Sequence, residues 1–250
     1  MRRRILLLSI LIISSCSTKK DILYLQDHRI FDSNELKLED QKIQVGHILS
    51  INVATPFQEA SIEFNRARNY AANSVEMLRI EGYNVDNDGT IIFPVIGKIY
   101  LNGLTINEAQ NSIHEILLNK GLLKNHSVEI KILNSSFTIL GEVNNPGTYF
   151  YYENGINILK AIGLAGDLTI NGKRNDIKII RDKNGIKSIS QIDLTSSNFL
   201  NSPFYYIRNG DVIIINPNTN RIKNAGIIGN SGTLISLFSF ILTSIILITN

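Results

Sequence analysis

The sequence contains no tryptophan and only one cysteine, Cys16, among its 250 residues. A single cysteine excludes any disulfide within the chain. The sequence also lacks a P-loop, a G-x-S-x-G elbow, a G-x-G-x-x-G loop and an HExxH helix, which are signatures of common enzyme and cofactor sites. The four histidines are isolated, and none stands at metal-ligand spacing: His28, His47, His114 and His126. We therefore expect a protein that is not an enzyme, with no catalytic residue, no metal site and no cofactor.

Basic and acidic side chains are also nearly balanced in number. The chain has 25 basic and 22 acidic side chains, but three of the basic ones are arginines within the first 15 residues. Without those residues, 22 basic side chains stand against 22 acidic ones. Overall charge therefore gives no reason to expect a nucleic-acid partner.

The start of the chain resembles a bacterial lipoprotein signal. Arg2–Arg4 precede nine apolar residues, Ile5–Ile13, a run too short to span a bilayer but normal for a secretory signal. The following sequence, ISSC, resembles a lipobox. The resemblance implies that a signal peptide, residues 1–15, is removed and that Cys16 is acylated, with a lipidated lead over 16–39 and membrane lipid as a partner. The alternative is an ordinary secretory signal that contains a cysteine.

Residues 40–132 predict a first unit that mixes strands with one helix. QKIQVGHILSINVA and SVEIKI are typical of strands. Asp88-Gly89 predicts a hairpin turn between the apolar runs on either side. Thr105 and Glu108 form a capping box before apolar residues at helical spacing, and Lys120-Gly121 is typical of a helix end. The stretch 57–79 is compatible with either a helix or a long exposed loop.

Residues 134–217 predict a second unit. SFTILGEV and TYFYY are typical of strands on either side of a turn at Asn144–Gly147, and INILKAIGLAG predicts a short helix that ends at Gly166. DIKIIR and GIKSISQI predict two strands paired across Lys183–Gly185, and VIIINP predicts a final strand. This order indicates a β-grasp-like sheet with one helix, and the fold class of the whole chain is predicted to be α+β.

Aromatic side chains are frequent in the second unit. Sugars stack on aromatic faces, so these side chains are candidates for a glycan-binding surface. The alternative is ordinary packing between strands, where aromatic residues are common. The residues concerned are Tyr149, Phe150, Tyr151, Tyr152, Tyr205 and Tyr206.

Taken in order, these motifs resemble the outer-membrane polysaccharide export family, which exports capsule and exopolysaccharide. In the first unit, VDNDGTIIFPVIGKI, GLTINEAQNSI and SVEIKI resemble motifs of the family's export domain. In the second unit, ILGEVNNPGTYFY resembles the hallmark of the soluble-ligand-binding β-grasp (SLBB) module, with Gly141, Pro146 and Gly147 in place. The chain has room for one such module.

Two positions depart from the family pattern. The family usually has Gly-Asp before its first strand, where this chain has Gly46-His47. It usually has Ala-Gly-Gly after the short helix, where this chain has Ala165-Gly166-Asp167.

The resemblance implies a homo-oligomeric ring, often an octamer, anchored by lipid in the outer membrane with its domains in the periplasm. Such a ring receives a polysaccharide from an inner-membrane polysaccharide co-polymerase and passes it outward. The C-terminal helices of the ring form a barrel through the outer membrane.

The C-terminal segment, residues 224–250, contains no charged side chain. Its apolar stretch 233–249 measures about 26 Å as a helix, slightly short of the roughly 30 Å of a hydrocarbon core. Because a single segment satisfies its backbone groups in lipid only as a helix, we predict a transmembrane helix. Small and hydroxyl residues recur every three or four positions and form one stripe: Gly229, Gly232, Ser236, Ser239 and Thr243. The stripe is predicted to face the pore or neighbouring subunits; the alternative is a plain hydrophobic anchor.

Two functions of different classes therefore follow from the sequence. The first is an oligomeric outer-membrane channel component that exports capsular or extracellular polysaccharide from the periplasm to the cell surface. The second is a periplasmic glycan-binding scaffold lipoprotein that forms no pore. The two differ in their need for residues 224–250, since a scaffold would tolerate any other anchor in their place.

Overall fold

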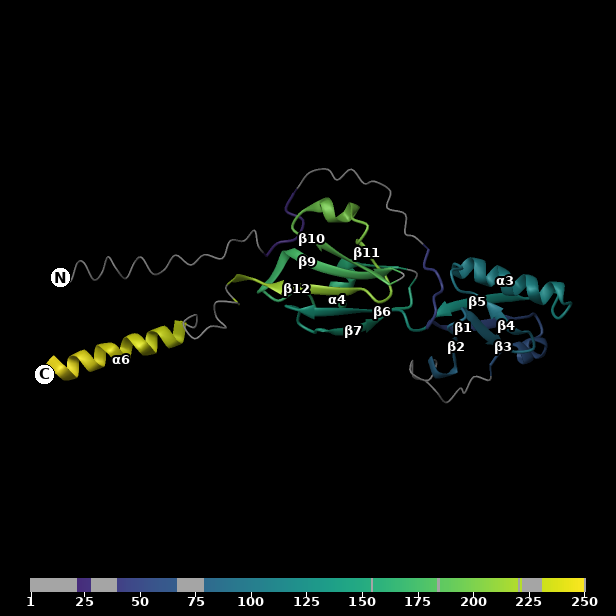
Figure 1. Ribbon diagram of the computed structural model, residues 1–250, viewed down its shortest axis with the longest axis horizontal. Helices are drawn as coiled ribbons and strands as arrows, with labels where there is room; N and C mark the ends of the chain where they lie inside the picture. Colours follow the sequence, from purple (N-terminus) through teal and green to yellow (C-terminus); the bar gives the residue numbers. More distant parts are fainter. Residues whose placement is uncertain are drawn as a thin grey trace.

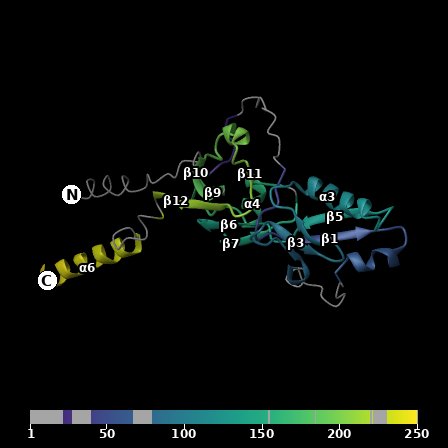
Figure 2. The same cartoon turned by 45° about the vertical axis from the view of Figure 1, so that its right-hand side comes forward.

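The computed structural model describes residues 22–27, 40–66, 79–153, 155–183, 185–219, 221 and 231–249. The predicted lipidation site, Cys16, and the first residue of the predicted stripe, Gly229, lie outside these ranges. Strands and helices alternate irregularly along the chain, which confirms the predicted α+β class. Figures 1 and 2 show two sheet-containing units next to each other along the long axis of the molecule.

The first unit is built on a three-stranded antiparallel sheet. Its central strand, β1 (Ile48–Ala54), lies between β2 (Tyr83–Asn84) and β5 (Ser127–Ile132). The pairing of β1 with β5 is continuous over six residues, from Leu49 opposite Ile132 to Ala54 opposite Ser127. Alternate residues of β1 are buried, as expected for a sheet with one face on the core.

The helix of the first unit, α3 (Ile106–Asn119), begins at the predicted capping box. The Glu108 amide donates to the Thr105 hydroxyl, and the Thr105 amide donates to the Glu108 carboxylate at 2.8 Å. The hydrogen bond from the Thr105 amide, and then the one from the Thr105 hydroxyl, lower the pKa of the Glu108 carboxyl. The helix ends at Lys120, as predicted, and Gly121 follows with a φ of 67°. One face of α3 packs on the core through residues four apart: Ala109, Ile113 and Leu117.

The hairpin of the first unit lies one turn later than predicted. Asp88-Gly89 does form a turn, but the strand before it, β2, pairs with β1 instead of with the strand after it. The hairpin instead joins β3 (Thr90–Phe93) to β4 (Gly97–Tyr100) through Pro94-Val95-Ile96. Pro94 has no amide hydrogen to offer a ladder, so it is better placed in this turn than within a strand.

The segment for which the sequence left helix and loop open begins with a 3-10 helix. This helix, η2, covers Gln58–Phe64 and buries Phe64 against the core of the first unit. Residues 67–78 lie outside the described ranges.

The second unit is built on a five-stranded sheet with the order β10-β9-β12-β6-β7. Its strands are β6 (Ser136–Gly141), β7 (Gly147–Phe150), β9 (Gly172–Lys183), β10 (Ile186–Ile192) and β12 (Val212–Pro217). The predicted hairpin between β9 and β10 is confirmed over seven paired residues. Only the β12–β6 pair of this sheet is parallel. The remaining elements are β8 (Ile156–Asn157), α4 (Ile158–Leu164), η3 (Ser197–Asn201) and β11 (Tyr206–Ile207).

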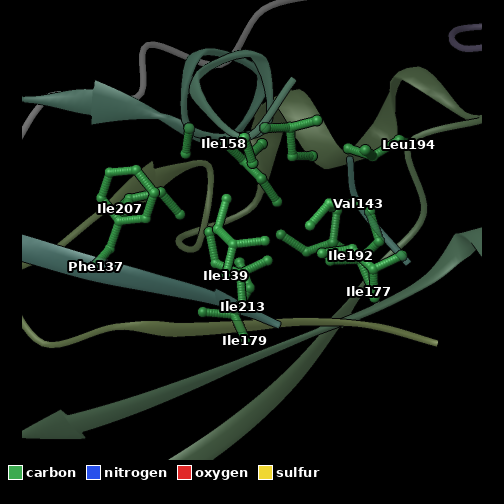
Figure 3. Packing of buried hydrophobic residues seen from close by; sticks show 14 of the residues in the cluster. Phe137, Ile139, Val143, Ile158, Ile177, Ile179, Ile192, Leu194, Ile207 and Ile213 are labelled. Carbon is green, nitrogen blue, oxygen red and sulfur yellow. The ribbon is translucent and has the colours of Figure 1, made fainter. Parts of the chain in front are cut away.

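Each unit has its own hydrophobic core. In the first unit the core contains the buried faces of β1, β5 and α3. In the second unit, α4 and the sheet enclose a cluster rich in isoleucine, part of which is seen in Figure 3. Its fully buried members include Ile139, Ile158, Ile177, Ile179 and Ile213.

The last helix, α6 (Ser231–Thr249), forms within the segment where the sequence predicted one. Within the part of the chain that the structure describes, no helix is long and apolar enough to cross a membrane. The transmembrane part of our prediction for residues 224–250 is therefore not supported. Large apolar side chains along α6 are exposed: Ile235, Leu237, Phe238, Phe240, Ile241, Leu242, Ile246 and Leu247.

Candidate functional site

The hallmark motif of the second unit begins at a close approach between the backbones of two strands. Gly141 ends β6 and lies opposite Ile215 of β12, with a φ of 95°. A Cβ atom on Gly141 would lie 2.0 Å from the Ile215 carbonyl oxygen, which accepts the amide hydrogen of Glu142 at 3.1 Å. Only glycine fits this position, because both the backbone conformation and the space exclude a side chain.

The turn that follows Gly141 holds the end of the short helix α4. The amide of Asn145 donates to the Ala165 carbonyl at 2.9 Å, and the Asn144 side chain donates to the Gly166 carbonyl at 2.6 Å. Pro146 follows in this turn, and Gly147 begins β7 with open space around its Cα. Pro146 and Gly147 therefore shape the turn, whereas Asn144 and Asn145 make its long-range contacts.

Polar side chains join the two units at their boundary. Asn134 is central, because its amide oxygen accepts from the Ile48 amide at 2.9 Å and its nitrogen donates to the Gly46 carbonyl at 2.8 Å. Across the boundary, Gln41 donates to the Ser135 hydroxyl at 3.0 Å. His47 lies 3.0 Å from the Asn209 side chain, measured from Nε2 to Nδ2. The first unit is thus tied to the start of β6 and to the turn before β12.

A small polar cleft lies at this boundary and encloses about 70 Å³. Carboxylate, amide and hydroxyl groups from both units line it, beside the exposed ring of Tyr152: Asp40, Gln41, Asn107, Ser135 and Glu153. Such groups hydrogen-bond to sugar hydroxyls. Of the predicted aromatic surface, the structure brings Tyr152 to the cleft, while Tyr151 is buried in the core.

Arg79 joins the exposed aromatic residues of β7 to the first unit. Its guanidinium lies 3.6 Å from the centre of the Phe150 ring and donates to the Leu133 carbonyl at 3.1 Å. A second contact reaches the Tyr152 hydroxyl at 3.4 Å. The aromatic edge beside the cleft is therefore held in place by a cation from the other unit.

The predicted stripe of α6 is only partly described. Gly232, Ser236, Ser239 and Thr243 are all exposed. The Thr243 hydroxyl donates to the Ser239 carbonyl at 2.8 Å, which satisfies the hydroxyl within the helix. The stripe thus offers small, weakly polar surface along a helix whose other side chains are mostly apolar.

Comparison with known proteins gives the decisive observation. Residues 37–133 match the model of the family described as "Polysaccharide biosynthesis/export protein", and residues 136–190 match the SLBB domain. The chain belongs to the polysaccharide export family and carries one SLBB domain. No curated protein matches the chain. The polysaccharide export family handles polysaccharide, and its members are typically periplasmic or associated with the outer membrane. The export and SLBB families consist of transport and binding proteins, not enzymes.

His47, at one of the departures from the family pattern, is buried at the boundary between the export domain and the SLBB domain. Its side chain is 3% exposed, and burial lowers its pKa to about 4. Its Nδ1 accepts the amide hydrogen of Gln44 at 3.1 Å, and its Nε2 faces the amino group of Asn209. A protonated ring would present a donor to each of these donors, so the neutral ring is the form that fits.

The burial of His47 predicts a loss of stability at acidic pH. The unfolded chain binds a proton at His47 below about pH 6.5, whereas the folded protein does so only near pH 4. The contribution of the neutral ring to the free energy of unfolding is therefore fully present above pH 6.5. It decreases as the pH falls to 4, by about 3 kcal/mol in total. We expect His47→Gln to flatten this part of the dependence when free energies of unfolding are measured in urea at several pH values. An unchanged slope would show that His47 is not the group responsible.

The structure also brings together two histidines that appear isolated in the sequence. The rings of His114 and His126 lie with their centres 4.3 Å apart. Burial, and then the charge of His114, lower the pKa of His126, and neither ring nitrogen of His126 has a hydrogen-bond partner among the described residues. Among those same residues, no group of three or more His, Cys, Asp and Glu side chains is placed to bind a metal. The sequence carries no signal for the pair, because His114 lies on α3 and His126 in the loop after it.

Proposed function

We propose that this protein is an oligomeric component of the outer membrane that passes capsular or extracellular polysaccharide from the periplasm to the cell surface. The observation that carries the proposal is α6, a helix of 19 residues with no charged side chain and with exposed apolar residues along its length. Burying such a surface is strongly favourable, so α6 is suited to contact lipid and further copies of itself. Membership of the polysaccharide export family supplies the class of cargo.

In this proposal the subunits form a ring, with an octamer as the expected size. Residues 1–15 are a signal peptide that is removed, and Cys16 is acylated. Residues 40–132 are the export domain and 134–217 the SLBB domain, with the boundary at the polar contacts of Asn134. An inner-membrane polysaccharide co-polymerase delivers the polymer to the periplasmic end of the ring.

A glycan-binding scaffold without a pore is the second candidate function. The cleft at the domain boundary favours it, because Tyr152 and the polar groups around it have the chemistry of a sugar contact. A scaffold needs α6 only as an attachment, so another anchor would serve in its place. A channel, in contrast, needs the particular surface of α6.

The test is single-cysteine labelling of α6 in a functional protein whose native cysteine is retained for acylation. We expect cysteines at Ser236, Ser239 and Thr243 to cross-link between subunits or to react with water-soluble reagents. Cysteines at Leu237 and Ile241 are expected to react with lipid-soluble reagents only, because in the proposed channel those side chains face lipid. Equal behaviour of the two sets would leave no role for the stripe.

The same preparation distinguishes the two candidate functions. After gentle detergent extraction, electron microscopy of particles should show a closed ring, and polysaccharide at the cell surface should be lost when residues 224–250 are replaced by an unrelated anchor. A monomer whose export survives this replacement would support the scaffold instead.

A further inference from the structure

The described part of the N-terminal lead, residues 22–27, is bound along the SLBB domain. The amides of Leu25 and Gln26 donate to the carbonyls of Leu194 and Thr195, at 3.0 and 2.7 Å. These carbonyls follow β10, and Figure 1 shows the lead beside β9 and β10. The lead therefore adds backbone hydrogen bonds at the edge of the domain, although more than 160 residues separate it from this edge in the sequence.

Asp27, the last residue of this described part of the lead, caps the 3-10 helix η3. The Asp27 carboxylate accepts from the Ser197 amide at 2.7 Å, from the Ser197 hydroxyl at 2.8 Å and from the Ser196 hydroxyl at 3.0 Å. These hydrogen bonds, with that from the Ser197 side chain first, lower the pKa of Asp27. An ionised carboxylate at the first turn is the favoured partner for free amides there.

Tyr24 makes the contact that ties the lead to the loop after α4. Its hydroxyl donates to the carboxylate of Asp167. The guanidinium of Arg174 lies 5.2 Å from the centre of the Tyr24 ring, and the ring packs against the core of the SLBB domain. Burial, followed by the hydrogen bond to Asp167, raises the pKa of Tyr24. The tyrosine is thus held by Asp167 of the loop after α4 and by Arg174 at the start of β9.

Asp167 holds this position at a conformational cost. Its φ is 72°, in the left-handed region where glycine is the default. The chain therefore accepts a strained residue in place of the relaxed one. What the aspartate adds is its carboxylate, which accepts from Tyr24 and from the amide of Leu168 at 2.6 Å.

The same loop holds the chain where it leaves β12 toward α6. The amide of Asn218 donates to the Asn171 carbonyl at 2.7 Å, and Pro217 pairs with Gly172. Glu142 of the hallmark motif accepts from the Thr169 hydroxyl at 2.7 Å and from Arg221 at 3.3 Å. The Arg221 side chain is 61% exposed in this ion pair, so the hydrogen bond to Asn171 is the stronger attachment.

We propose that residues 167–174 of the SLBB domain are a clamp that holds both the lead and the segment leading to α6. The clamp makes the two ends leave the domain next to each other. The inference rests on the proposed function, in which Cys16 is acylated. Five residues lie between Cys16 and Ile22, so the two are about 21 Å apart at most. The clamp therefore holds the SLBB domain, rather than the export domain, against the membrane.

The test uses Asp167→Gly in the full-length processed protein, in detergent micelles. Glycine relieves the strained backbone, so the variant is expected to fold with an unchanged or higher Tm. Loss of the carboxylate is expected to raise the hydrogen-exchange rates of the Leu25 and Gln26 amides about tenfold, the effect of one hydrogen bond to a charged group. Tyr24→Phe should have the same effect, whereas Tyr100→Phe, at an exposed tyrosine of the export domain, should have none.

The clamp further requires that the two ends affect each other. We expect Asp167→Gly to raise the exchange rate of the Asn218 amide severalfold as well, because both contacts depend on one loop. Unchanged exchange at Leu25 and Gln26 would refute the attachment through Asp167. Faster exchange of the Leu25 and Gln26 amides with an unchanged rate at the Asn218 amide would refute the clamp. The two segments would then be attached to the domain independently. Neither readout depends on export or on ring formation, so failure of the proposed function is seen separately.

Discussion

Alanine at position 141 is expected to lower the free energy of unfolding of the SLBB domain by about 3 kcal/mol or more. The new Cβ would lie 2.0 Å from the Ile215 carbonyl oxygen, which is rigid backbone and cannot rotate away as a side chain can. The φ of 95° adds strain for any residue with a Cβ. Relief requires the parallel strands β6 and β12 to separate at the point where Glu142 hydrogen-bonds to Ile215. Because the chain has no tryptophan, unfolding in urea is best followed by tyrosine fluorescence together with circular dichroism.

Gly147 provides the matched control from the same hallmark motif. No heavy atom lies within 4 Å of the position that its Cβ would take, and its φ is not in the left-handed region. Gly147→Ala is therefore expected to change the free energy of unfolding by less than about 0.5 kcal/mol. Equal effects of the two substitutions would contradict the structure, in which a side chain is excluded at Gly141 but has room at Gly147.

Local features of the fold could be predicted from the sequence because their causes are local. The capping box of Thr105 and Glu108 fixes where α3 begins, and Lys183–Gly185 fixes the β9–β10 hairpin. Each depends on residues within one turn of chain. The order of the motifs then sufficed to identify the export and SLBB modules.

Contacts between distant residues could not be predicted in the same way. The choice of β2 to pair with β1 rather than with β3 depends on competition between surfaces more than 30 residues apart. The same holds for the His114–His126 pair and for the lead, whose polar sequence gives no sign of its contacts. The one local sign of the lead's binding site was the departure at Asp167, where an aspartate stands in place of a turn glycine.

The buried ion pair of the SLBB domain is a further contact that the sequence did not reveal. Arg181 of β9 and Asp211, just before β12, lie 30 residues apart and have side chains 8% and 0% exposed. Three hydrogen bonds join them: Nε donates to both carboxylate oxygens, at 2.9 and 3.3 Å, and Nη2 donates to Oδ2 at 2.7 Å. Arg181 also donates to the carbonyls of Pro203 and Tyr206, and Asp211 accepts from the Arg208 amide. The pair therefore holds residues 203–208, which include β11, against the central strands of the sheet.

Asp211→Ala is expected to lower the free energy of unfolding by about 3–5 kcal/mol, because it leaves the Arg181 cation buried without a counter-charge. The double variant Arg181→Met, Asp211→Asn should lose much less than the sum of its single variants, since no charge then remains buried and asparagine still accepts from Arg208. The matched control is Lys160→Met, which breaks an equally short but exposed pair with Glu153 and should cost less than about 1 kcal/mol. Urea unfolding of the five variants, which are Asp211→Ala, Arg181→Met, Asp211→Asn, the double variant and Lys160→Met, measures these free energies. If the loss of free energy of unfolding in the double variant equals the sum of the two single losses, each residue acts through its own contacts. An unpaired buried charge would then not be the reason for the large effects of the single variants.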